Sequence, residues 1–190
     1  MGVVNSRTTA IGLVALFGLF VMSCGSDELS IGDSASGLNG GFETTEHGYP
    51  VNWAFFPNPE TDSALQVVLD SEDVAEGAHS LKVVVGPSEV LPAIRSRRIP
   101  VQPGRDYRLA MSVKNEGCDI QVNRIVQGPH GKTVHRRDMI ISTSASLPEW
   151  ETFEEILSVA PDEGNVVLVV MLGASGTVWL DDVRVEEVAG

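Results

Sequence analysis

Cysteine and cationic side chains are scarce in this chain of 190 residues. Only two cysteines occur, Cys24 and Cys118, so a disulfide framework is not expected and packing must hold the fold together. Lys and Arg number 13 against 26 Asp and Glu, which gives a formal net charge of −13. A surface this acidic argues against binding nucleic acid, or other anionic polymers, through a basic field.

Long apolar runs are absent after the first two dozen residues. The single run, residues 10–22, follows Arg7 and is shorter than the roughly 20 residues that a membrane-spanning helix needs. It ends at Ser23-Cys24, which predicts a secretory signal cleaved before Cys24 and a lipid on the Cys24 thiol. The alternative is an ordinary secretory signal with an incidental cysteine.

The anchor divides the chain into three parts and places it in the cell. We expect a lipoprotein signal peptide over residues 1–23, a flexible Gly-, Ser- and Asp-rich tether over 24–37, and one folded domain over 38–190. The domain is long enough to bury its own core. Lipidation implies a membrane-anchored protein of the bacterial cell envelope, at the outer membrane, facing either the periplasm or the outside.

Helical periodicity is also missing beyond Leu38, where short strand patterns alternate with Gly and Pro turns. This pattern predicts an all-β fold, a two-sheet antiparallel β-sandwich of the jelly-roll kind. Asn115-Glu116-Gly117 is expected to close a hairpin between two of the strands. The expected strands are 65–69, 81–85, 93–99, 107–114, 119–127, 132–141, 150–159, 165–172 and 177–186.

Four motifs follow one another along the chain: Leu38–Glu43 with Gly48-Tyr49-Pro50 and Trp53, Gly77–Val83, Ile99–Leu109, and Thr177–Val185. Together they resemble the galactose-binding-like jelly rolls. The nearest resemblance is to carbohydrate-binding modules of families four, nine and twenty-two, and it extends from Leu38 to Val188. It implies a sugar-binding sandwich.

The same resemblance implies a structural calcium ion that joins the start of the domain to its last strand. Oxygens would come from Glu43, from the segment ending at His79, and from Asp181 or Asp182. Calcium prefers carboxylate and carbonyl oxygens, so the chemistry suits these residues. Asp181 shares parity with core-facing Val183 and is the better inward candidate. The alternative is that these carboxylates only accept hydrogen bonds from backbone amides.

Two groups of residues are candidates for ligand binding. Aromatic rings for stacking on sugars are expected from the Pro-rich loop, because Trp53, Trp150 and Trp179 are expected to pack in the core. Polar side chains are expected as one outward row on two neighbouring strands. The candidates are Tyr49, Phe55 and Phe56 in the loop, and Arg108, Ser112, Lys114, Gln121 and Asn123 in the row.

Catalytic motifs are missing as well. No Gly-rich phosphate loop or Gly-x-Ser-x-Gly occurs, and the crowded Glu151, Glu154 and Glu155 suit a polar strand face. His130 and His135 have no evident companion ligands for zinc. We therefore predict a non-catalytic lipoprotein that binds polysaccharide. The alternative is a structural or protein-interaction lipoprotein with the same sandwich, and a hydrolase is the third reading.

Overall fold

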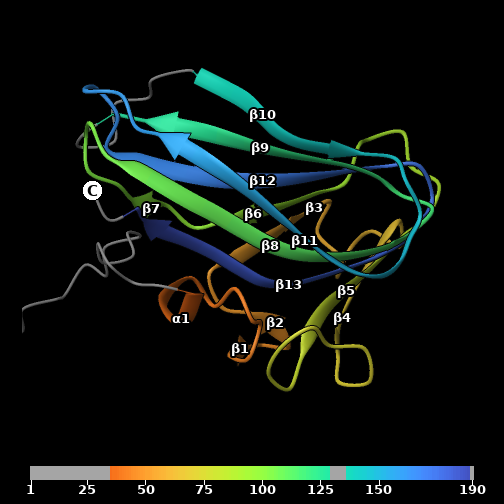
Figure 1. Ribbon diagram of the computed structural model, residues 1–190. Helices are drawn as coiled ribbons and strands as arrows, with labels where there is room; N and C mark the ends of the chain where they lie inside the picture. Colours follow the sequence, from red (N-terminus) through yellow and green to blue (C-terminus); the bar gives the residue numbers. More distant parts are fainter. Residues whose placement is uncertain (1–34, 129–135, 189–190) are drawn as a thin grey trace, which may run out of the picture.

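The computed structural model describes residues 35–128 and 136–188, which form two antiparallel β-sheets packed face to face (Figure 1). The two-sheet sandwich predicted from the strand pattern is confirmed. The strands of the first sheet are β4 (Leu65–Asp70), β5 (Ser80–Val85), β8 (Asp106–Glu116), β11 (Leu147–Ser158) and β13 (Gly176–Glu187). The strands of the second are β3 (Trp53–Phe56), β6 (Ala93–Ser96), β7 (Ile99–Pro100), β9 (Asp119–Gln127), β10 (Arg136–Thr143) and β12 (Asn165–Gly173).

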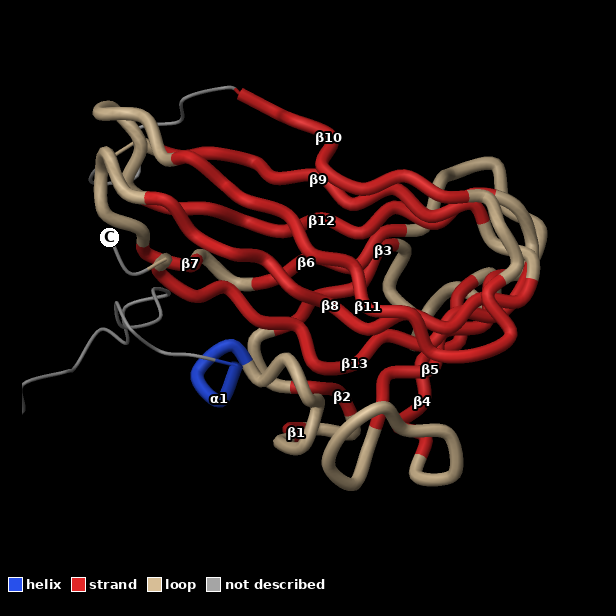
Figure 2. The backbone as a smooth tube through the Cα atoms, in the orientation of Figure 1, coloured by secondary structure: helices blue, strands red, loops and turns tan. Residues whose placement is uncertain are grey.

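The strand order follows that of a jelly roll, with consecutive strands often in opposite layers. The five-stranded sheet has the order β11-β8-β13-β5-β4. The six-stranded sheet has the order β10-β9-β12-β6-β3, with β7 paired to β12. Figure 2 shows that nearly all of the described backbone is strand or loop. Three short elements precede the sandwich: the helix α1 (Ala35–Leu38) and the paired strands β1 (Thr45–Glu46) and β2 (Tyr49–Pro50).

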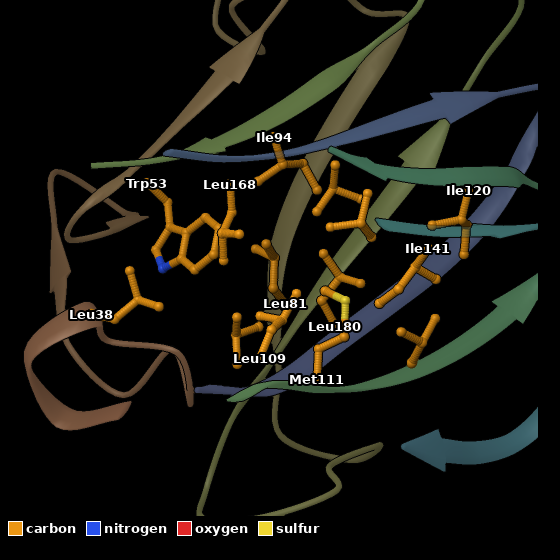
Figure 3. Packing of buried hydrophobic residues seen from close by; sticks show 14 of the residues in the cluster. Leu38, Trp53, Leu81, Ile94, Leu109, Met111, Ile120, Ile141, Leu168 and Leu180 are labelled. Carbon is orange, nitrogen blue, oxygen red and sulfur yellow. The ribbon is translucent and has the colours of Figure 1, made fainter. Parts of the chain in front are cut away.

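The core lies between the two sheets and is built from alternate residues of each strand. Leu109 on β8 and Leu180 on β13 are fully buried, and Ile94 on β6 faces them from the other sheet. Figure 3 shows these side chains pointing toward one another. Each fully buried aliphatic side chain contributes about 1.5–3 kcal/mol, so this packing stabilises the domain without a disulfide.

The N-terminal segment closes one end of the sandwich. Leu38 and Phe42 are buried in the core, and the Phe42 ring lies 5.4 Å from the Trp53 ring. The Trp53 indole donates to the Asn39 carbonyl, and the amide of Val183 on β13 donates to Gly40. Packing of Trp53 in the core agrees with the sequence prediction. The first and last parts of the domain are therefore joined side by side.

The predicted hairpin at residues 115–117 is wrong, because β8 and β9 belong to different sheets. The Asn115 side chain donates to the carbonyls of Cys118 and Ala145, and its oxygen accepts from the Cys118 amide. These bonds shape the connection into an arch that carries the chain from one layer to the other. Sequence alternation looks the same on both sides of an arch and of a hairpin.

Candidate functional site

Two adjoining pockets lie where β1 and β2 meet β3 and β6. One has a volume of ≈ 500 Å³ and the other ≈ 440 Å³. They share Tyr49, Trp53 and Ala54, so they adjoin each other at the edge of the six-stranded sheet. We call the two pockets together the edge site. Its defining residues are Tyr49, Phe55, Phe56, Arg95, Arg97 and Arg98.

The three predicted aromatic candidates come together in the smaller pocket. Tyr49 and Phe55 form a tilted pair with ring centroids 5.8 Å apart. Alternation along β3 turns Phe55 toward the core and Phe56 to the outside, where Phe56 is 60% exposed. Among the described residues, Phe56 is the one aromatic side chain that stays largely in solvent. An exposed ring beside a hollow is what stacking on a sugar requires.

Three arginines line the larger pocket and were not singled out from the sequence as ligand candidates. Arg95 lies on the outer face of β6, and Arg97 and Arg98 follow it toward β7. Their alternation with buried Ile94 and Ser96 was visible in the sequence as a strand pattern. What the pattern could not reveal was that β3, with its exposed ring, pairs directly with β6.

The predicted polar row does not form one surface. Arg108, Ser112 and Lys114 lie on the outer face of the five-stranded sheet, whereas Gln121 and Asn123 lie on the outer face of the other. The arch after Asn115 separates the two groups and places them on opposite sides of the molecule. The prediction of a single cleft is therefore wrong, because the chain changes sheet between β8 and β9.

The β8 part of that row is engaged within the protein. The Arg108 guanidinium contacts the Glu186 carboxylate at 3.1 Å. Buried Ser112 lies 3.2 Å from the hydroxyl of Thr152 on β11. On the opposite face, Gln121 is exposed while Asn123 is buried and accepts a hydrogen bond from Arg137 on β10.

Trp179 was predicted to pack in the core, but it does not lie between the two sheets. Its register partner is Lys114, so it faces outward from the five-stranded sheet, yet it is only 5% exposed. The ammonium groups of Lys82 and Lys114 lie 4.8 and 5.1 Å from its ring centre, and its indole donates to Asp70. Cation–π contacts and this hydrogen bond bury the ring without a second sheet above it.

The Glu43 carboxylate, which the resemblance implied as a calcium ligand, lies beside residues 77–79. Its oxygens accept hydrogen bonds from the backbone amides of Ala78 and His79 and contact the His79 ring at 2.9 Å. The Ala78 amide, followed by the His79 side chain, lowers the pKa of Glu43. Gly77 makes this close approach possible, because a side chain there would collide with the Glu43 carboxylate.

Asp181 and Asp182 lie at a β-bulge in β13, where the register to β8 shifts. Asp182 has a φ of 48°, which breaks the alternation, so the parity argument that aimed Asp181 inward with Val183 is wrong. Asp181 instead points out of the sheet and is completely buried beneath the loop after β4. Its carboxylate accepts hydrogen bonds from the amides of Ala75, Glu76 and Asp182.

Burial raises the pKa of both Asp181 and Asp182. Amide donors oppose the rise at Asp181, and the Arg184 guanidinium opposes it at Asp182. Nearby Glu43 and Glu76 add like charge. A cation would be favoured by this local negative charge, but most carboxylate oxygens already accept N–H donors. In the described part of the chain, no three His, Cys, Asp or Glu side chains form a metal-binding group.

Three residues that the sequence analysis singled out, Cys24, His130 and His135, lie outside the described residues. Cys118 is buried in the core and free, and burial raises the pKa of its thiol to about 11, so it is not an activated nucleophile. Within the described residues, no helix has the length and apolar character needed to span a membrane. The side chains of Glu151 and Glu154 are exposed on β11, at the sheet edge.

Similar architectures occur in solved structures of sugar-binding modules. The family 22 xylan-binding domain of Paenibacillus barcinonensis matches with a TM-score of 0.53 and 15% identity, over 76% of this chain and 91% of that one. A family 4 carbohydrate-binding module matches with a TM-score of 0.52 and 15% identity, over 79% of this chain and 98% of that one. The fold is that of these carbohydrate-binding modules.

An enzyme also shares this fold over part of its length. The enzymatically active domain of a tailspike protein from bacteriophage CBA120 matches with a TM-score of 0.59 and 13% identity, over 73% of this chain. This chain corresponds to 20% of that one. No protein-family model and no curated protein matches the sequence. At such identities the likeness establishes the fold alone.

Proposed function

We propose that this protein binds carbohydrate without catalysis, and that the edge site is where the sugar binds. The observation that carries the proposal is the exposed Phe56 ring in the smaller of two adjoining pockets, on a fold shared with xylan-binding and other carbohydrate-binding modules. Sugar rings stack on aromatic faces, while neighbouring polar groups meet their hydroxyls. Tyr49 and the arginines of the edge site supply such groups.

A panel of plant and bacterial polysaccharides, assayed by affinity electrophoresis or calorimetry, tests the proposal. We expect binding to at least one polymer, and a loss of about tenfold in Phe56→Ala, since an aromatic contact contributes about 0.5–1.5 kcal/mol beyond its buried area. Ile156→Ala is the matched control, because Ile156 is 57% exposed on the opposite face. Equal losses in the two variants would place the sugar elsewhere, and no binding to any polymer would overturn the proposal.

Protein interaction is the second candidate function. Val90 and Leu91 are 65% and 58% exposed in the loop before β6, next to each other in sequence. A protein partner would cover this apolar loop. Cross-linking in envelope fractions, with the wild type and with Val90→Ser, separates the two functions. The substitution leaves the edge site intact, so it should lower cross-linking to a protein partner and leave sugar binding unchanged.

We further propose that Cys24 carries a lipid, which anchors the domain to the outer membrane of the cell envelope. The support is the sequence Ser23-Cys24 after a short apolar run. Intact-mass analysis of the purified protein should find a chain that begins at an acylated Cys24. An unmodified N-terminus at another residue would end this proposal.

Calcium stays a proposal as well. Glu43 and Asp181 each keep acceptor capacity on one oxygen that has a single N–H partner, and their neighbours leave the local charge negative. A bound cation would offset that charge and stabilise the folded state. We expect a chelator to lower the melting temperature and added calcium to restore it. An unchanged midpoint would mean that backbone amides alone satisfy these carboxylates.

A further inference from the structure

We propose that the polymer bound at the edge site is anionic, with carboxylate groups that pair with Arg95, Arg97 and Arg98. This inference rests on the proposed sugar-binding function and adds the chemical class of the ligand. It also revises the conclusion drawn from the net charge of −13, which describes the whole surface and not this part of it.

Most basic side chains among the described residues contact a carboxylate of the protein itself. Arg95, Arg97 and Arg98 have no such contact among the described residues, although the chain has twice as many acidic as basic residues. The basic side chains with a carboxylate within ion-pair distance are Lys82, Arg105, Arg108, Lys114, Arg124 and Arg184.

The pocket that the arginines line has more basic than acidic residues. Glu46 is the single carboxylate among its lining residues, and it lies 3.7 Å from the ring of His47. Three arginines and one glutamate therefore line this pocket of ≈ 500 Å³, while Glu60 lines the smaller pocket beside it. A guanidinium binds a carboxylate through two parallel hydrogen bonds, which makes arginine well suited to such groups.

Arg95 lies close to the exposed ring of Phe56. In the β3–β6 pair, Ala54 lies opposite Arg95 and Phe56 opposite Ala93. Arg95 and Phe56 are thus diagonal neighbours on one face, about 7–8 Å apart at their Cα atoms. A sugar ring stacked on Phe56 can place a carboxylate substituent within reach of Arg95. Arg97 follows two residues later, about 7 Å along the chain, toward the next sugar of the polymer.

The test compares polymers that differ in charge but share a backbone. The full-length protein is titrated with carboxymethylcellulose and hydroxyethylcellulose, and with polygalacturonate and its methyl ester. We expect the charged member of each pair to bind more tightly, by about tenfold, and to lose that advantage between about 0.05 M and 0.5 M salt as charges are screened. Equal binding of both members would overturn the inference and leave the proposed function standing. No binding to any polymer would overturn the proposed function itself.

Variants locate the effect. Arg95→Gln with Arg97→Gln should lower affinity for the charged polymers by about tenfold and for the neutral polymers by much less, since the two exposed ion pairs form with the charged polymers alone. Arg105→Gln is the matched control, because Arg105 is exposed and pairs with Glu187. An equal loss in the control would show general charge attraction and would overturn the assignment to the edge site.

Two further ligands separate the sources of negative charge. Dextran sulfate presents sulfate groups on a sugar backbone, and duplex DNA presents phosphates without pyranose rings. Binding that prefers carboxylated polymers over dextran sulfate supports carboxylate as the recognised group. Binding of DNA as tight as that of polygalacturonate would overturn a sugar-specific site in favour of unselective anion binding.

Discussion

The outer faces of the two sheets use the same kinds of residues in opposite ways. On the five-stranded sheet, Lys82 and Lys114 cover Trp179 and pair with Asp70 and Asp73, so ring and charges are occupied by each other. On the edge of the six-stranded sheet, Phe56 stays exposed beside arginines that have no carboxylate partner among the described residues. The comparison teaches that residue type alone does not mark a candidate binding surface. Such a surface is marked by side chains for which the protein does not already supply a partner.

The loop between β4 and β5 makes the difference. It lies over the five-stranded face, and its amides at Ala75 and Glu76 donate to buried Asp181. Asp73, in the same loop, reaches the ammonium of Lys114. The edge site has no comparable cover from the described residues, and its hollow stays open. Three experiments examine this contrast, in order of expected effect.

Trp179→Ala should have the largest effect on stability. It removes a ring that is 5% exposed, and loss of a buried tryptophan costs about 3–5 kcal/mol. Phe56→Ala should stay within about 0.5 kcal/mol, because that ring is mostly in solvent. Urea denaturation measures both. Similar costs for the two rings would remove the distinction between a closed and an open face.

Gly77→Ala should cost about 2 kcal/mol, because the residue has φ 74° and an added Cβ would strike the Glu43 carboxylate. Gly104→Ala is the matched control, with the same φ of 74° and open space around it. The difference between the two variants in urea denaturation reports the Glu43 contact. Equal costs would show that backbone conformation accounts for the whole effect.

Asp70→Asn should cost about 1 kcal/mol at neutral pH, after allowance for solvent screening of a charge near the surface. The indole of Trp179, followed by the Glu72 amide, lowers the pKa of Asp70 from 3.8 to about 2. A carboxyl whose pKa is lower in the folded state stabilises it above the unfolded pKa. The difference between wild type and variant should therefore shrink as pH falls from about 4 to about 2. A difference that persists below pH 2 would contradict this role of the charge.

Much of the fold followed from the strand patterns. Strands such as β9, where polar and apolar residues alternate between turns, were located to within a few residues, because alternation and turn residues are local properties. The short strands β1, β2 and β3 were missed, since their segment is rich in proline and reads as a loop. β3 forms through pairing with β6, which is a property of the tertiary structure.

The candidate site was predictable only in part. Tyr49, Phe55 and Phe56 were identified because rings in a loop suggest a ligand, and they do share a pocket. The prediction of one polar row was wrong because the arch between β8 and β9 carries the chain from one sheet to the other, which sequence alternation cannot reveal. The prediction that Asp181 points inward was wrong because the bulge at Asp182 shifts the alternation by one residue. Whether a charged side chain finds an internal partner depends on sheet order, so the open arginines could not be distinguished from the paired ones.

The burial of Leu38 and Phe42 has a consequence for cleavage of the chain. A protease that cuts before Ala35 would leave every core contact among the described residues in place. A cut after Phe42 would remove two side chains from the interior and end the backbone bond between Gly40 and Val183. The two products would therefore differ in stability, although the two cuts lie fewer than ten residues apart.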